Sequence, residues 1–208
     1  RVERVGNIML DSYELMSEKI AADTTMSDLG LTEVQYGVVT LHRPSNVDDK
    51  ETLTLLVDEF EKVSASVALV FPVHPRTRGN MEKFGLLERV KGIKGIHLIE
   101  PLGYIQFMNL VKSSALAITD SGGLQEETTY LGLPCLTLRP NTERPATITE
   151  GTNKLVKPAD LSAEVAKALA GDWPTGCRPD LWDGKTAGRC LESLRACIAV
   201  GPANLKNR

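Results

Sequence analysis

The sequence predicts a doubly wound, Rossmann-like α/β fold built on a parallel sheet. Short apolar runs alternate along the chain with longer segments whose apolar residues recur at helical spacing. The short runs are continuously apolar, which is typical of strands covered on both faces and not of strands with one face in water. Because the segments that join them are short, each crossover between parallel strands should be right-handed.

The strands are expected at residues 36–41 (YGVVTL), 67–73 (VALVFPV), 96–99, 115–119, 135–138 and 154–156. The helices are expected at residues 7–22, 53–63, 104–111, 121–131, 161–170 and about 186–200. One helix end is marked clearly. Gly132 can adopt the left-handed conformation that ends a helix, and Pro134 cannot continue one.

Composition narrows the class of protein. The chain has 208 residues, of which 25% are charged and 42% hydrophobic, so a disordered or fibrous chain is excluded. The net charge is −3 and no block of Lys or Arg occurs, which argues against binding to nucleic acid. No apolar run approaches the roughly 18 residues that cross a bilayer, so we expect a cytoplasmic protein that does not bind membranes.

A metal site is not expected. The four cysteines form no C-x-x-C pair, and no cluster of His, Cys and carboxylates has the spacing of metal ligands. The cysteines are interpreted as small buried hydrophobic residues in a reducing compartment.

Ligands of doubly wound folds bind at the carboxyl ends of the strands, so the residues that follow each strand are the candidates for a site. Polar and charged groups follow five of the expected strands. They are His42 and Arg43 after the first, His74 and Arg76 after the second, Glu100 after the third, Asp120 to Gly123 after the fourth, and Arg139, Glu143 and Arg144 after the fifth.

The strongest local signal is the sequence Asp120-Ser121-Gly122-Gly123, which joins a strand to a helix. Free N–H groups at a helix start bind anions, and glycine lets the backbone approach a phosphate closely. The sequence is neither G-x-G-x-x-G nor a Walker motif, and an ordinary capped helix start is the alternative. Glu127, one turn later, could accept both hydroxyls of a ribose, or could be a solvated or ion-paired carboxylate. The residues alone indicate an anionic ligand, of which a nucleoside diphosphate is the best candidate.

The other candidates also have two interpretations. His42 and His74 could act as acid or base or bind phosphate, or could be structural histidines. Arg43 and Arg144 could clamp a diphosphate through paired donors, or could be surface residues. Phe107 could stack on a base or belong to the core.

Six motifs in a fixed order carry a specific resemblance. They are T-L-H-R-P-S-N-V-D at 40–48, P-V-H-P-R-T-R at 72–78, P-L-x-Y-x-x-F at 101–107, T-D-S-G-G-L-Q-E-E at 119–127, T-E-R-P at 142–145 and G-T-N at 151–153. Together they resemble the non-hydrolysing UDP-N-acetylglucosamine 2-epimerases of bacteria and archaea.

The resemblance implies a two-domain GT-B architecture with the active site between the domains. Residues 1–208 would be the carboxyl-terminal, UDP-binding domain, with residues 186–200 as its closing helix. The amino-terminal domain would be absent from this chain, which begins at Arg1. The complete protein would be a homodimer that needs neither a metal nor a nicotinamide cofactor.

The resemblance also implies roles for individual residues. They are Ser121, Gly122 and Gly123 for the phosphates, Glu127 for the ribose, the backbone near Leu102 and Phe107 for the uracil, Arg144 for the substrate, His42 as the catalytic histidine, and Arg43 and His74 as further possible site residues.

The implied activity is that of an isomerase that inverts carbon 2 of UDP-N-acetylglucosamine to give UDP-N-acetylmannosamine. UDP would be eliminated to leave a 2-acetamidoglucal and would then be added back. The family's carboxylates for proton transfer at carbon 2 belong to the other domain, so we expect this half alone to be inactive. The alternatives are the donor-binding domain of a GT-B glycosyltransferase and a non-catalytic module that binds a UDP-sugar.

Overall fold

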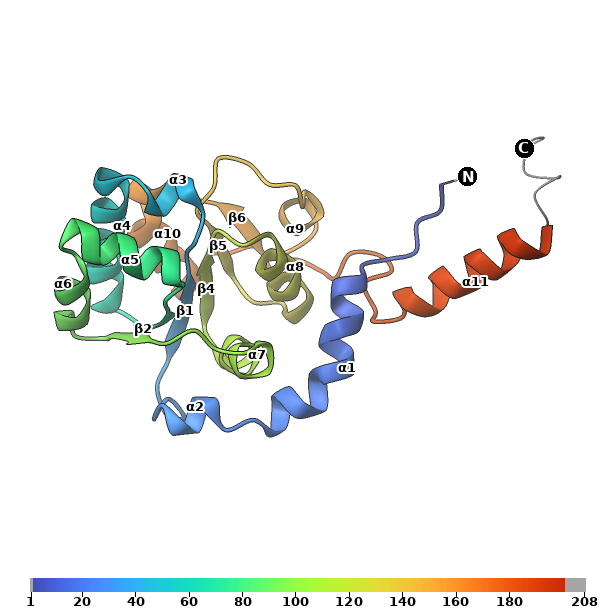
Figure 1. Ribbon diagram of the computed structural model, residues 1–208, viewed down its shortest axis with the longest axis horizontal. Helices are drawn as coiled ribbons and strands as arrows, with labels where there is room; N and C mark the ends of the chain where they lie inside the picture. The colour runs from blue at the N-terminus through green and yellow to red at the C-terminus, as the bar shows by residue number, and fades with distance from the viewer. Residues whose placement is uncertain (1, 201–208) are drawn as a thin grey trace.

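The structure, a computed structural model, describes residues 2–200 and shows one twisted sheet between two layers of helices (Figure 1). The sheet has six parallel strands in the order β3-β2-β1-β4-β5-β6. The strands are β1 (Tyr36–Thr40), β2 (Ala68–Pro72), β3 (Ile96–Ile99), β4 (Leu116–Thr119), β5 (Cys135–Thr137) and β6 (Asn153–Leu155). The doubly wound fold and the position of each strand are therefore confirmed.

The helices in the described chain are α1 (Ile8–Ala22), α2 (Thr25–Asp28), α3 (Pro44–Val47), α4 (Lys50–Ser64), α5 (Pro75–Phe84), α6 (Leu87–Gly92), α7 (Tyr104–Ser113), α8 (Gly122–Leu131), α9 (Ala146–Thr149), α10 (Leu161–Leu169) and α11 (Thr186–Val200), with a 3₁₀ turn at Pro158–Asp160. The expected end of the helix at 121–131 is also confirmed, because Gly132 follows α8 with a φ of 70°.

Alternating strand residues fill two separate cores, one on each face of the sheet. Val39 of β1 faces the core shared with α4, α5, α6 and α10, whereas its neighbour Val38 faces the core shared with α1, α7 and α8. Phe71 and Val70 of β2 divide between the same two cores. Both faces are apolar because both are covered, which explains the continuously apolar strand sequences.

Five helices were not expected from the sequence, namely the four-residue helices α2, α3 and α9 and the longer α5 and α6. In α5 only Thr77 and Met81 are buried, so its apolar residues show little periodicity. Its ends are nevertheless well defined. The His74 side chain accepts a hydrogen bond from the Arg76 N–H, Pro75 occupies the first turn, and Gly85 ends the helix with a φ of 75°.

The helix expected at 186–200 is present as α11 and extends away from the sheet beside α1 (Figure 1). Asp11 of α1 accepts hydrogen bonds from the N–H groups of Thr186 and Ala187 at its start. Residues 1 and 201–208 of the expected domain lie outside the described residues. No helix within residues 2–200 is long and apolar enough to cross a membrane.

Gly151, the first residue of the G-T-N motif, provides a test of the close packing between α8, α9 and β6. A Cβ at this buried glycine would lie 2.5 Å from the Thr129 side chain and 2.6 Å from the Thr147 carbonyl oxygen. We therefore expect Gly151→Ala to lower the free energy of unfolding by about 1–3 kcal/mol, measured by urea denaturation.

The matched control is Gly79→Ala in α5, where a Cβ meets no heavy atom within 4 Å. This change should raise the free energy of unfolding by up to about 1 kcal/mol, because alanine loses less conformational entropy in a helix. Equal effects of the two substitutions would contradict the packing described for Gly151.

Candidate functional site

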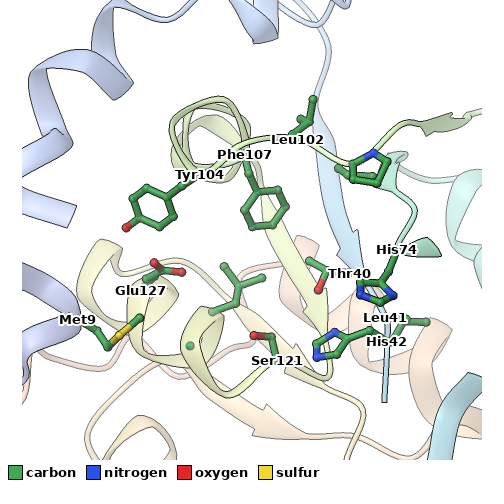
Figure 2. A pocket seen from close by; sticks show the side chains of 14 residues that line it. Met9, Thr40, Leu41, His42, His74, Leu102, Tyr104, Phe107, Ser121 and Glu127 are labelled. Atoms are coloured by element: carbon green, nitrogen blue, oxygen red, sulfur yellow. The ribbon is translucent and has the colours of Figure 1, made fainter. Parts of the chain in front are cut away.

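A cleft of about 360 Å³ lies at the carboxyl edge of the sheet. It opens where β1 and β4 lie side by side, and this is the point at which the strand order reverses direction. Its lining residues are Met9, Thr40, Leu41, His42, Pro72, His74, Pro101, Leu102, Tyr104, Phe107, Ser121, Gly123, Leu124 and Glu127. Leu102, Tyr104 and Phe107 form one wall, and His42, His74 and Ser121 face them from the other side (Figure 2).

His42 is held by Asp120, a completely buried carboxylate at the end of β4. The backbone N–H groups of His42 and Arg43 donate to Asp120, at 3.1 Å and 2.8 Å respectively. The Asn46 side-chain amide adds a third donor at 3.0 Å. The Nδ1 atom of His42 lies 3.1 Å from Asp120 Oδ1, so the carboxylate fixes both the loop after β1 and the orientation of the imidazole.

His74 stands next to His42, with the two ring centroids 5.6 Å apart. Its Nδ1 atom accepts the N–H of Arg76 at 3.2 Å and thereby caps α5. The structure therefore brings together two histidines that follow neighbouring strands, as expected from their positions in the sequence.

The start of α8 is open toward the cleft. Ser121 is the N-cap residue, but its hydroxyl makes no capping hydrogen bond, and the first turn contains no acidic side chain. A Cβ on Gly123 would lie 3.9 Å from the Met9 side chain, an ordinary van der Waals distance, so the position accepts a Cβ without a clash. A Cβ on Gly122 would lie 3.0 Å from Glu143 Oε1, so Gly122 faces the Glu143 side chain and does not line the cleft. The helix start predicted to bind phosphate is thus accessible from the cleft at Ser121 and Gly123, and its phosphate-binding role stays a prediction.

Glu127 is a buried carboxyl at the other end of the cleft. Its pKa is raised to about 7, mainly by burial and in smaller part by the neighbouring Glu126, whereas a hydrogen bond from Tyr104 lowers it. Tyr104 itself is desolvated there, which raises the pKa of its hydroxyl. Glu127 is therefore neither the solvated carboxylate nor the ion-paired carboxylate that the sequence left open.

The arginines do not line the cleft. Arg144 Nε lies 3.1 Å from Oε1 of Glu126, which also accepts the Asn7 side-chain amide at 2.9 Å. Arg43 and Arg139 both face Glu143, at 3.8 Å and 2.8 Å. Arg139 holds the pKa of Glu143 down to about 2, so this carboxylate is charged at neutral pH.

The apolar wall contains both residues predicted for it. Leu102 and Phe107 are half-buried, and they pack against the core below α7 while lining the cleft. Sequence reasoning missed the contributions of Met9, Thr40 and Tyr104 to the cleft and the role of Asp120 behind it. Tyr104 could have been found, because it is part of the P-L-x-Y-x-x-F motif at residues 101–107. Within residues 2–200, no group of three His, Cys, Asp or Glu side chains could hold a metal ion.

Comparison with known proteins gives a consistent result. The chain is 42% identical over 171 residues to UDP-N-acetylglucosamine 2-epimerase of Methanocaldococcus jannaschii, covering 79% of this chain and 46% of that protein. It is 36% identical over 174 residues to UDP-2,3-diacetamido-2,3-dideoxy-D-glucuronate 2-epimerase of Pseudomonas aeruginosa, covering 82% and 46%. The chain therefore spans about half the length of the curated relatives it matches.

Solved structures agree. The crystal structure of the M. jannaschii UDP-GlcNAc 2-epimerase in complex with UDP-GlcNAc and UDP matches with a TM-score of 0.75 at 34% identity, covering 92% of this chain and 54% of that one. The Neisseria meningitidis UDP-GlcNAc 2-epimerase bound to UDP-GlcNAc matches with a TM-score of 0.77 at 25% identity, with the same coverage of each chain. The family model described as UDP-N-acetylglucosamine 2-epimerase matches residues 1–195, so the chain belongs to the UDP-N-acetylglucosamine 2-epimerase family.

Proposed function

We propose that this chain is the UDP-binding half of a UDP-N-acetylglucosamine 2-epimerase. The observation that carries the proposal is the cleft at the carboxyl edge of the sheet, which has the open start of α8 at one end and the buried carboxyl of Glu127 at the other. These two features match the two ends of a nucleoside diphosphate. The related M. jannaschii protein, whose crystal structure contains UDP-GlcNAc and UDP, supports the choice of ligand.

The diphosphate would lie over the first turn of α8. The free N–H groups of a helix start and the positive end of its dipole favour a negatively charged group there. Gly123 leaves room for the phosphate, and the uncapped Ser121 hydroxyl is available as a further donor. Gly122 would contribute only its backbone N–H, because its Cα faces Glu143.

The nucleoside would lie toward α7. Glu127 would accept hydrogen bonds from the ribose hydroxyls, and these donors would restore part of the solvation that burial removes. The uracil would lie against the wall that contains Leu102 and Phe107 and would contact the backbone there. Arg43 and Arg144 would reach the substrate only after leaving their present partners, Glu143 and Glu126.

The proposed reaction eliminates UDP from the substrate and adds it back after inversion at carbon 2. The start of α8 would stabilise the negative charge that develops on the departing diphosphate. His42 would act as the acid or base from this half. Glu127 is the only carboxylate among the lining residues, so proton transfer at carbon 2 needs groups that this cleft lacks.

The missing groups would come from a second domain of a GT-B architecture, consistent with relatives about twice as long as the matched region. The isolated half would then bind UDP without turning over substrate. We extend the proposal to a cytoplasmic homodimer for the complete protein, a property that rests on the family resemblance.

The sugar is less constrained than the nucleotide. The P. aeruginosa relative is an epimerase named for a different UDP-sugar, so members of this family share the UDP portion of the substrate. A GT-B glycosyltransferase is the competing function. It would need an acceptor sugar, whereas an epimerase in the two-domain protein would convert the UDP-sugar alone.

The first experiment is calorimetric titration of this chain with UDP, with ADP as the control. We expect binding of one UDP per chain and at least tenfold weaker binding of ADP. The reason is that the larger purine of ADP would not fit the wall formed by Leu102, Tyr104 and Phe107, where the uracil is proposed to lie. Equal affinities would contradict the uracil assignment. If this chain and a two-domain protein restored around it both failed to bind UDP, the proposed function would be wrong.

Gly123→Leu tests the position of the phosphates. The side chain would extend into the cleft above the helix start, so we expect UDP affinity to fall by about 100-fold, or about 3 kcal/mol. The thermal unfolding temperature should change little, because the site of the new Cβ is open. The control, Gly79→Leu at an exposed position of α5, should leave UDP affinity unchanged. If Gly123→Leu retained its affinity for UDP, the diphosphate would not bind at the start of α8.

Glu127→Gln tests the energetic effect of the buried carboxyl. The folded-state pKa of about 7 lies above the ordinary value of 4.5, so ionisation of Glu127 destabilises the fold by up to about 3 kcal/mol above pH 7. Below about pH 4.5 the group is protonated in both states and the effect disappears. We therefore expect Glu127→Gln to be more stable than the wild type at pH 8, equal to it near pH 4, and weaker in binding UDP.

Urea denaturation at several pH values measures this difference. Glu18→Gln makes the same chemical change at an exposed position of α1 and should alter stability little at any pH. A Glu127→Gln variant that is less stable than the wild type at pH 8 would show that the folded protein stabilises the ionised carboxylate.

A further inference from the structure

The Nδ1 atoms of the two cleft histidines face groups of opposite polarity, a carboxylate acceptor for His42 and a backbone N–H donor for His74. Both oxygens of Asp120 accept hydrogen bonds, from the backbone N–H groups of His42 and Arg43 and from the Asn46 amide. A lone pair on His42 Nδ1 would face the negatively charged Asp120 Oδ1 at 3.1 Å, so the carboxylate favours a proton on this nitrogen. In a neutral imidazole the proton of His42 is therefore expected on Nδ1, and Nε2 carries a lone pair.

His74 has the reverse arrangement. Its Nδ1 atom accepts the backbone N–H of Arg76 at 3.2 Å, so this nitrogen must carry the lone pair. A neutral His74 therefore has its proton on Nε2. The hydrogen bonds found within the described residues include none at Nε2 of either ring, and both side chains line the cleft.

We propose that Asp120 and the N-terminal cap of α5 fix His42 and His74 in opposite tautomers, so that the pair presents one hydrogen-bond acceptor and one donor to the ligand. His42 Nε2 would accept from a hydroxyl or take up a proton, and His74 Nε2–H would donate to an anionic or carbonyl oxygen. Asp120 is thus a positioning residue that acts through His42. That the oxygen bound by His74 belongs to a UDP-sugar rests on the proposed function, whereas the tautomers do not.

The arrangement has a chemical consequence for the reaction. Two histidines in the same tautomer, 5.6 Å apart, would present like groups to the ligand. With opposite tautomers, His42 can accept a hydrogen bond from one group of the substrate while His74 donates one to another. If His42 Nε2 gains a proton during catalysis, Nδ1 keeps its own proton and Asp120 stabilises the resulting imidazolium.

The tautomers can be measured directly in this chain. Long-range ¹H–¹⁵N correlation spectra at about pH 8.5, well above the ordinary pKa of histidine, distinguish protonated from unprotonated ring nitrogens. The sequence has only three histidines, so His→Gln variants at positions 42, 74 and 97 assign every ring. We expect His42 to be protonated at Nδ1, with a downfield Nδ1–H proton, and His74 to be protonated at Nε2. The same tautomer in both rings would overturn the proposal.

Asp120→Asn tests the cause. An asparagine can keep its oxygen toward Arg43 and Asn46 and turn its amide N–H₂ toward His42, so the proton should move from Nδ1 to Nε2 of that ring. His74 and the exposed His97 should be unchanged and serve as internal controls. An unchanged His42 would show that Asp120 does not set the tautomer. If this variant does not fold, the wild-type tautomers and the His42 Nδ1–H resonance still decide the proposal.

Substitutions of His74 test its role as a donor. His74→Gln keeps a side-chain N–H donor, whereas His74→Leu removes it, so we expect Leu to weaken UDP binding by about tenfold and Gln by much less. Equal losses in both variants would overturn the donor role. If neither the wild-type chain nor the restored two-domain protein binds UDP, the proposed function is wrong, and the tautomer measurements still decide the tautomer proposal independently.

Discussion

The carboxylate of Asp120 is the constraint on which the site depends. It is fully buried at the end of β4, and an ion in that position costs several kcal/mol unless donors surround it. Its donors come from the segment after β1, the strand beside β4, and include the backbone of His42 and Arg43. Asn46, which also donates to the Leu138 carbonyl oxygen after β5, extends the tie to a third strand. Because the buried Asp120 carboxylate needs these donors, it fixes the loops at the edge of the sheet where the strand order reverses.

A second buried network fixes the other side of α8. The Gln125 amide donates to the Ser121 carbonyl oxygen and accepts from Thr142 and Asn153. Asn153 in turn accepts from Thr137 of β5 and donates to Thr147 of α9. Thr142 and Thr147 hold the backbone N–H and carbonyl oxygen of Arg144. The G-T-N motif therefore has a structural role, through the hydrogen bonds of Asn153. It fixes the loop that carries Glu143 and Arg144 against the start of α8.

The sheet and much of the site could be predicted because the parallel sheet converts sequence position into spatial position. Residues that directly follow β1, β2 and β4 must meet at one edge, and His42, His74 and Ser121 do so. The helix α5 could not be predicted because its caps, and not an apolar stripe, define it. The role of Asp120 was equally hidden, because an aspartate after a strand can face the ligand or the protein with the same sequence.

The arginines show a further limit of the sequence. Arg144 follows a strand and is a natural candidate for a phosphate clamp, but its contact with Glu126 depends on how the loop after β5 folds back on α8. Pairings of this kind join residues far apart in the chain and leave no periodic signal. Glu143 has the same effect on Arg43 and Arg139. The cationic groups that follow the strands are thus largely neutralised by carboxylates of neighbouring segments.

The charge balance of the cleft follows from this neutralisation. No Lys or Arg is among its lining residues, so the start of α8 and the Nε2–H group proposed for His74 would have to compensate an anionic ligand. Glu127 adds a desolvated carboxyl at the far end, and burial raises its pKa to about 7. In the unliganded cleft, the N–H groups at the start of α8 have no acceptors. At the other end, the Glu127 carboxyl lacks enough hydrogen-bond donors to replace the solvation that it has lost. A nucleoside diphosphate supplies both, phosphate oxygens and ribose hydroxyls. Under the proposed function, an analogue without those hydroxyls would leave Glu127 unpaired, and the cost of that unpaired carboxyl would favour a ribonucleotide.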